Sequence, residues 1–122
     1  MKIAIIDDDR LMLKSLHHTL ETNGHNVFTT DKVENLRKHL LEKQIELIIS
    51  DVMMPNVESL DFLNHLSELG FKKIPVILIS SLSNPTLLKK MNEHGLSDFL
   101  HKPFTNEQLL RKINYIELKN FL

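Results

Sequence analysis

Residues that can do chemistry follow four short apolar runs of this 122-residue sequence. They are Asp7, Asp8 and Asp9 after "KIAII", Asp51 after "ELIIS", Ser80 at the end of "PVILIS" and Lys102 at the end of "DFLHK". Carboxylates brought together repel one another and raise one another's pKa. A hard divalent cation such as Mg²⁺ relieves this repulsion, because it prefers carboxylate and carbonyl oxygens. A lysine and a hydroxyl opposite can bind an oxyanion such as a phosphoryl group.

These residues meet only if the apolar runs are neighbouring strands, and the sequence predicts this arrangement. The chain alternates apolar runs at 2–6, 26–30, 46–50, 75–80 and 98–102 with helical patterns at 10–22, 32–42, 57–69, 85–94 and 105–121. This alternation is typical of a parallel sheet covered by helices on both faces. The first, third and fourth runs are almost wholly apolar, which indicates central strands. The predicted fold class is α/β, a doubly wound five-stranded parallel sheet in the order 2-1-3-4-5.

Turn and capping residues agree with these boundaries. Each of the three glycines follows a predicted helix, where a left-handed C-terminal cap favours glycine; they are Gly24, Gly70 and Gly95. Asp9 is the expected N-cap of the helix at 10–22. Thr105 and Gln108 have the spacing of a capping box at the start of the last helix.

The predicted topology brings the candidate residues to one edge of the sheet. Ligands of doubly wound sheets bind beyond the carboxyl ends of the strands, near the switch point, here between strands 2–6 and 46–50. Asp7, Asp8 and Asp51 would converge there, with Ser80 and Lys102 on the next strands. A carboxylate can be a covalent nucleophile, and charge neutralisation supplies much of the catalysis in phosphoryl transfer. We therefore expect Asp51 to act on a phosphoryl group that shares a metal with the first aspartates.

At these residues the sequence resembles the receiver domain of two-component response regulators. The resemblance covers the whole chain and rests on "IIDDD" (5–9), "IISDVMMP" (48–55), "PVILISS" (75–81) and "HKPF" (101–104), in the family's order and spacing. It implies a flavodoxin-like (βα)5 receiver fold and a single receiver domain over residues 1–122. It also implies a signalling domain, not an enzyme, that assists its own phosphorylation and slow hydrolysis. The donor would be a histidine kinase or a histidine phosphotransfer protein.

The resemblance assigns the acceptor and the metal ligands. Asp51 would be the phospho-acceptor. Asp8 would bind Mg²⁺ directly and Asp7 through water, while the backbone carbonyl of Met53 would be a further ligand.

The resemblance also assigns the residues that respond to the phosphoryl group. Lys102 would contact that group, and its bond to Pro103 is expected to be cis. Ser80 would be the switch hydroxyl, and Phe99 the aromatic residue that turns inward with it. Two simpler interpretations stay open: Ser80 as a hydrogen-bonding strand end, and Phe99 as a static packing aromatic.

Other functional classes fit less well. A phosphatase of the haloacid-dehalogenase type expects a second aspartate two residues after the nucleophile, where Met53 stands. A receiver-like domain that only binds partners would not need the reactive groups, all of which are present. A nucleotide or flavin binder needs a glycine-rich phosphate loop, whereas the glycines all follow helices.

Composition restricts the possible partners and cellular compartment of the protein. The net charge is −1 with mixed signs, so there is no basic footprint for direct nucleic-acid binding. No apolar run approaches the roughly 20 residues that cross a membrane. The chain has no cysteine, which fits a reducing compartment, and we expect a cytoplasmic protein. The seven histidines are scattered and are predicted to lie mostly at the surface.

The last predicted helix carries more apolar surface than its core contacts need. Its core stripe is Leu109, Ile113 and Ile116, and the residues that widen it are Tyr115, Leu118, Phe121 and Leu122. With the helix at 85–94 and the strand at 98–102, it would form the face through which receivers bind a second copy or an effector. A frayed end, or the stub of a longer protein, fits the same residues.

Overall fold

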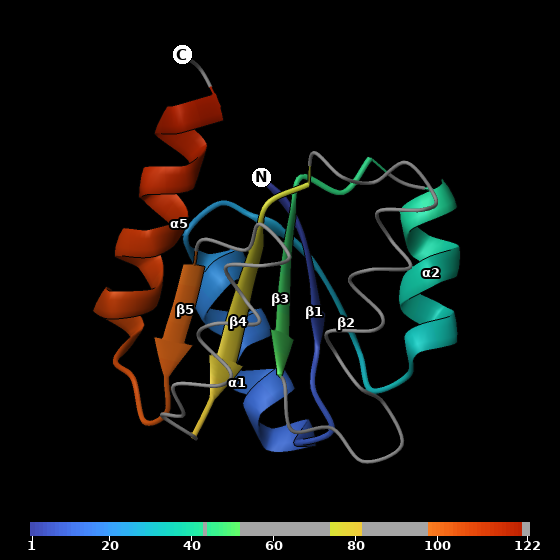
Figure 1. Ribbon diagram of the computed structural model, residues 1–122, viewed down its shortest axis with the longest axis horizontal. Helices are drawn as coiled ribbons and strands as arrows, with labels where there is room; N and C mark the ends of the chain where they lie inside the picture. Colours follow the sequence, from blue (N-terminus) through green and yellow to red (C-terminus); the bar gives the residue numbers. More distant parts are fainter. Residues whose placement is uncertain (43, 52–73, 82–97, 121–122) are drawn as a thin grey trace.

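The computed structural model describes residues 1–42, 44–51, 74–81 and 98–120 (Figure 1). Its elements, in chain order, are β1 (Lys2–Ile6), α1 (Arg10–Thr22), β2 (Asn26–Thr30), α2 (Val33–Glu42), β3 (Leu47–Asp51), β4 (Val76–Ser80), β5 (Asp98–His101) and α5 (Asn106–Asn120). The predicted helices at 57–69 and 85–94, and with them Met53, Gly70 and Gly95, lie outside the described residues.

The strands form one parallel sheet in the order β2-β1-β3-β4-β5, which confirms the predicted fold class. All residues of β3 and β4 are buried, and so is β1 after Lys2, whereas β2 and β5 are partly exposed. The apolar runs are therefore the central strands, and the polar runs are the edges, as their composition indicated. The arrowheads of β3, β4 and β5 in Figure 1 point to the same edge of the sheet.

Alternate side chains of the central strands build a separate apolar core on each face. Ile3 and Ile5 of β1 pack in a cluster with α1 and α5, whereas Ala4 and Ile6 pack in a second cluster with α2. Figure 1 shows α2 set apart from the other two helices. Each fully buried leucine or isoleucine contributes roughly 2 kcal/mol to stability, so these contacts hold the helices on the sheet.

Helix caps fix where α1 and α5 begin. The Asp9 carboxylate accepts hydrogen bonds from the backbone N–H of Leu11 and Met12. At α5, Thr105 Oγ1 accepts from Gln108 N at 3.1 Å, and Gln108 Oε1 accepts from Thr105 N at 2.8 Å. Both predicted caps are confirmed, and helix α5 begins one residue later than predicted because Thr105 is the cap.

One strand boundary differs from the prediction in a way that affects the site. Strand β3 runs to Asp51, which pairs in register with Ile79 of β4, whereas the sequence pattern ended the strand at residue 50. Asp51 is thus the last residue of a buried strand and not the first residue of the following turn. Its backbone is held by the sheet, so the sheet positions its carboxylate.

His25 departs from the predicted surface pattern of the histidines. His25, between α1 and β2, is only 7% exposed, and its Nδ1 lies 3.0 Å from the Met1 amino nitrogen. Burial lowers the pKa of this histidine, and the nearby amino-terminal charge lowers it further. His25 is therefore buried beside the amino ends of β1 and β2, at the opposite end of the strands from the aspartates.

No helix in the described ranges is long and apolar enough to cross a bilayer.

The replacement Gly24→Ala is expected to destabilise the protein by about 1 kcal/mol. Gly24 follows the C-cap of α1 with φ of 88°, a left-handed conformation that strains any residue with a Cβ. A Cβ there would meet no atom within 4 Å, so the cost comes from the backbone alone. Urea denaturation measures it. Gly24→Asn is the control and should lose less, because asparagine tolerates this region; equal losses would contradict the conformational explanation.

Candidate functional site

Three carboxylates converge at the carboxyl edge of the sheet. Strands β1 and β3 pair with Ile6 opposite Ser50, so the residues that follow, Asp7 and Asp51, lie side by side. One carboxylate oxygen each from Asp7, Asp8 and Asp51 lies within 4.8 Å of the others. Asp7 is 1% exposed and Asp51 5%, whereas Asp8 is exposed. The predicted convergence is therefore present, with one of the three carboxylates open to solvent.

Lys102 follows the edge strand β5 and reaches this cluster with its side chain. Its Nζ lies 3.4 Å from Asp7 Oδ2 and 3.5 Å from Asp51 Oδ2. Its backbone N–H donates to the carbonyl of Ser80 at 2.8 Å, which ties the end of β5 to the end of β4. The Lys102–Pro103 peptide is cis, as predicted. The Lys102 ammonium is thus within ion-pair distance of both carboxylates.

The environment of Asp7 disfavours its charged form. Burial is the main cause, and it raises the pKa of Asp7 to about 6; the nearby Asp51 carboxylate raises it as well. The Asp9 backbone N–H, which donates to Asp7 Oδ1 at 2.9 Å, and the Lys102 ammonium act in the opposite direction. A positive charge added to this cluster would therefore favour ionised Asp7.

Ser80 and Phe99 lie on the strands beyond this cluster. Ser80 is the last residue of β4, is fully buried, and pairs in register with His101. Phe99 is half-buried and packs against the apolar cluster on the α2 side of the sheet, with its ring centroid 6.5 Å from that of His101. This packing fits both predicted interpretations of Phe99, a static aromatic and a rotating one.

Two further buried polar residues lie at the same edge, and sequence reasoning had not assigned them to it. Thr30 ends β2, and its carbonyl accepts from Asp7 N at 3.1 Å. Ser50 is 1% exposed, and its hydroxyl donates to the Asp51 carbonyl at 3.3 Å. The available signal was a polar residue closing an apolar run, as in "FTT" and "IIS". These contacts hold the backbone at both aspartates.

The family model for the response regulator receiver domain matches residues 3–114 of this chain. The chain belongs to this family. The four motifs noted in the sequence all lie within the matched residues, so the predicted family is confirmed. This receiver domain is therefore a component of two-component signal transduction.

Relatives and solved structures agree with this assignment. The chain is 29% identical to the rice two-component response regulator ORR3 over 119 residues, which are 96% of this chain and 91% of that protein. It is 33% identical to the transcriptional regulatory protein CpxR of Escherichia coli, covering 94% of this chain and 48% of CpxR. The receiver domain of DrrB, activated by BeF3, is 30% identical with a TM-score of 0.81, covering 94% of this chain and 95% of that domain.

The relatives differ in what accompanies the receiver domain. The chain spans about half or less of the length of several curated relatives that it matches, including transcriptional regulators and a sensor kinase. It spans nearly all of ORR3. The similarity therefore identifies the receiver domain and not one output that all these relatives share.

Proposed function

We propose that this receiver domain accepts a phosphoryl group on Asp51 in a Mg²⁺-dependent reaction, from a histidine kinase or a histidine phosphotransfer protein. One observation carries the proposal. The Asp51 carboxylate lies in a cluster with Asp7 and Asp8, and the ammonium of Lys102 lies 3.5 Å from Asp51 Oδ2. A carboxylate acceptor, an acidic metal site and a cation for the incoming oxyanion thus meet in one place.

The transfer itself uses the Asp51 carboxylate as nucleophile. A carboxylate oxygen forms a bond to phosphorus while the phosphorus–nitrogen bond of the donor phosphohistidine breaks, and the electron pair stays on the imidazole nitrogen. The Lys102 ammonium offsets negative charge on the phosphoryl oxygens. Attack of water on the acyl phosphate later returns the carboxylate and inorganic phosphate. The domain thus assists its own phosphorylation and dephosphorylation and acts as a signalling element.

The donor set fits a hard divalent cation. Three carboxylates and one ammonium leave two net negative charges at full ionisation, which one divalent cation balances. Asp7, Asp8, Asp51 and the Met53 carbonyl would hold the metal, although Met53 lies outside the described residues. Mg²⁺ held by these residues would supply charge neutralisation during phosphoryl transfer. Burial of Asp7 and Asp51 keeps competing water away from these charges.

The response to phosphorylation would pass through β4 and β5. We assign the switch hydroxyl to Ser80, which is buried at the end of β4, and the responding aromatic residue to Phe99 on β5. The backbone bond from Lys102 to Ser80 joins these two strands at the site. A change at the phosphoryl group can therefore bias both strand ends together.

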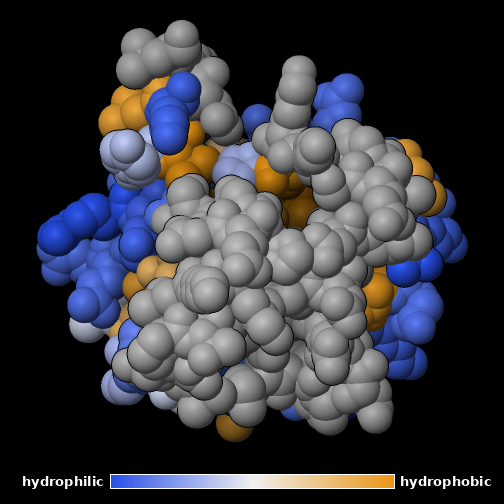
Figure 2. Space-filling view, in the orientation of Figure 1, coloured by the Kyte–Doolittle hydropathy of each residue, from blue (hydrophilic) through white to orange (hydrophobic). Residues whose placement is uncertain are grey.

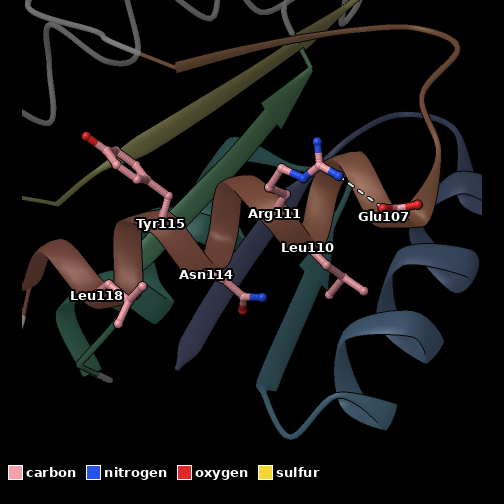
Figure 3. Close-up of a pocket in the computed structure, with 6 residues that line it drawn as sticks. All are labelled: Glu107, Leu110, Arg111, Asn114, Tyr115 and Leu118. Carbon is pink, nitrogen blue, oxygen red and sulfur yellow. Dashed lines mark hydrogen bonds and ion pairs between the residues drawn. The ribbon is translucent and has the colours of Figure 1, made fainter.

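The outer face of α5 is the proposed contact surface for a second copy or an effector. Tyr115 is 62% exposed and Leu118 66%, and Figure 2 shows hydrophobic side chains at the surface over this helix. Figure 3 shows a pocket on the same face, where Arg111 and Glu107 are paired at 3.0 Å. The helix at 85–94, predicted to share this face with β5, lies outside the described residues.

We further propose a domain boundary and a cellular compartment for this protein. Residues 1–122 would form one receiver domain, since the family model and the sheet together account for most of the chain. A histidine kinase takes its phosphoryl group from ATP inside the cell, so the domain would work in the cytoplasm.

The test is the intact mass of the protein after incubation with acetyl phosphate and Mg²⁺. We expect one added phosphoryl group, and none either without metal or in Asp51→Asn, which keeps the shape of the side chain but removes the nucleophilic carboxylate. Phosphorylation of Asp51→Asn to the same extent would refute Asp51 as acceptor. If acetyl phosphate gives no product, the same comparison is made with a phosphorylated histidine phosphotransfer protein as donor.

A further inference from the structure

Three consecutive aspartates at the end of β1 lie in three different environments. Asp7 is buried and contacts Lys102, and Asp8 is exposed and shares the acidic cluster. Asp9 is also exposed, but it is not a member of that cluster within the described residues. Its Oδ1 instead accepts from Leu11 N at 3.0 Å and from Met12 N at 3.2 Å. The third carboxylate is therefore used by helix α1.

The backbone of Asp9 is fixed by the same cap. Its carbonyl accepts from Leu13 N at 3.0 Å, and its φ of −86° and ψ of 103° are the extended values usual for an N-cap. The side-chain carboxylate and the backbone carbonyl of Asp9 are both bound to α1, so the direction of its N–H is set. That N–H donates to Asp7 Oδ1 at 2.9 Å.

This hydrogen bond orients the Asp7 carboxylate. Oδ1 is held by the Asp9 N–H, and Oδ2 is turned toward Lys102 Nζ at 3.4 Å. Asp7 is 1% exposed, so solvent offers few alternative partners. A backbone donor that holds a metal-binding carboxylate acts as an outer-shell partner, and such partners set ligand orientation and metal affinity.

We propose that Asp9 is a positioning residue for the metal site: by capping α1, it aims its own N–H at Asp7 and so presets the Asp7 carboxylate for Mg²⁺. The proposal rests on the metal site in the proposed function. Asp9 acts through its cap and not through its negative charge, which separates it from Asp7 and Asp8.

Two substitutions separate the cap from the charge. Asp9→Asn keeps an oxygen that can accept from Leu11 and Met12 but removes the charge, whereas Asp9→Ala removes both. The matched control is Thr105→Ala, which removes the equivalent N-cap of α5 at a similar cost of about 1 kcal/mol. Mg²⁺ affinity is measured by isothermal titration calorimetry on the full chain, and stability by urea denaturation without metal.

We expect Asp9→Ala to weaken Mg²⁺ binding by roughly tenfold, in the range for loss of an outer-shell partner. Asp9→Asn should stay within about twofold of the parent, because an exposed charge is screened by salt. Thr105→Ala should lose stability like Asp9→Ala and keep its Mg²⁺ affinity. Equal weakening in Asp9→Asn and Asp9→Ala would overturn the proposal in favour of a charge effect.

Unchanged affinity in Asp9→Ala would also overturn it and would leave the proposed function intact, since the parent would still bind Mg²⁺. Failure of the parent protein to bind Mg²⁺ is a different result. It would refute the metal site of the proposed function, and the positioning role of Asp9 would fail with it.

Discussion

Asp7→Asn is expected to stabilise the metal-free protein and, in the same molecule, to weaken its binding of Mg²⁺ by more than tenfold. Burial raises the pKa of Asp7 to about 6. Ionisation of this carboxylate at neutral pH therefore destabilises the folded protein relative to the unfolded chain. A shift of about two units corresponds to on the order of 2–3 kcal/mol. Asparagine retains an oxygen for the Asp9 N–H but carries no charge. We expect a gain of about 2 kcal/mol in the unfolding free energy at pH 7.5.

The gain in unfolding free energy caused by Asp7→Asn should increase with pH. The folded-state pKa lies above the ordinary value of 3.8, so between about pH 4 and pH 6 the folded protein binds more protons than the unfolded chain. The contribution of Asp7 to stability therefore falls as pH rises through this window, and Asp7→Asn lacks that fall. Urea denaturation at several pH values without metal measures the difference between the two proteins. A difference in unfolding free energy that did not change between pH 4 and pH 7 would contradict the raised pKa of Asp7.

Asp8→Asn is the matched control, because Asp8 is exposed and its charge carries little burial cost. Both substitutions should weaken Mg²⁺ binding by more than tenfold, as each removes an anionic oxygen donor. Only Asp7→Asn should stabilise the metal-free protein. In the parent, Mg²⁺ at 100 times its dissociation constant should add about 2.7 kcal/mol to stability, and at the same Mg²⁺ concentration each variant should gain less than about 1.4 kcal/mol.

Lys102→Ala is expected to keep the fold but to lose the structural response to phosphorylation. The ammonium lies within 3.5 Å of two buried carboxylates, so its removal leaves their charges without this partner. We expect a loss of roughly 1–3 kcal/mol in stability without metal. Added Mg²⁺ should restore part of it, because the metal supplies positive charge to the same carboxylates.

The response is measured as amide shift changes in ¹H–¹⁵N spectra on addition of BeF3⁻ and Mg²⁺, since BeF3 activates the receiver domain of DrrB. In the parent we expect changes along β5 and α5, and in Lys102→Ala their loss. Lys112→Ala is the control: it removes an ion pair of the same strand–helix unit, to Asp98 at 3.7 Å. That pair is partly exposed and worth at most about 1 kcal/mol, so the response should persist. An unaltered response in Lys102→Ala would remove the lysine from the mechanism.

The sequence by itself determined the five strands and their order in the sheet. Hydrophobic runs such as "KIAII" and "PVILIS" can be buried on both faces only in the centre of a parallel sheet, and polar residues in the other two runs assign these to the edges. Local chemistry also determined the caps at Asp9 and Thr105, because a cap depends on residues within three or four positions. These features are local or periodic, so a linear pattern contains them.

Tertiary structure alone decided which groups touch. Lys102 and Asp7 are 95 positions apart, and their contact depends on the register of neighbouring strands and on where β5 ends. The sequence "DDD" does not say which aspartate is buried, which is exposed and which caps the helix. That division arises because β1 ends at Ile6, at the carboxyl edge of the sheet, and α1 starts at Arg10. The burial of His25 and the raised pKa of Asp7 follow in the same way, since both depend on neighbours that only folding brings together.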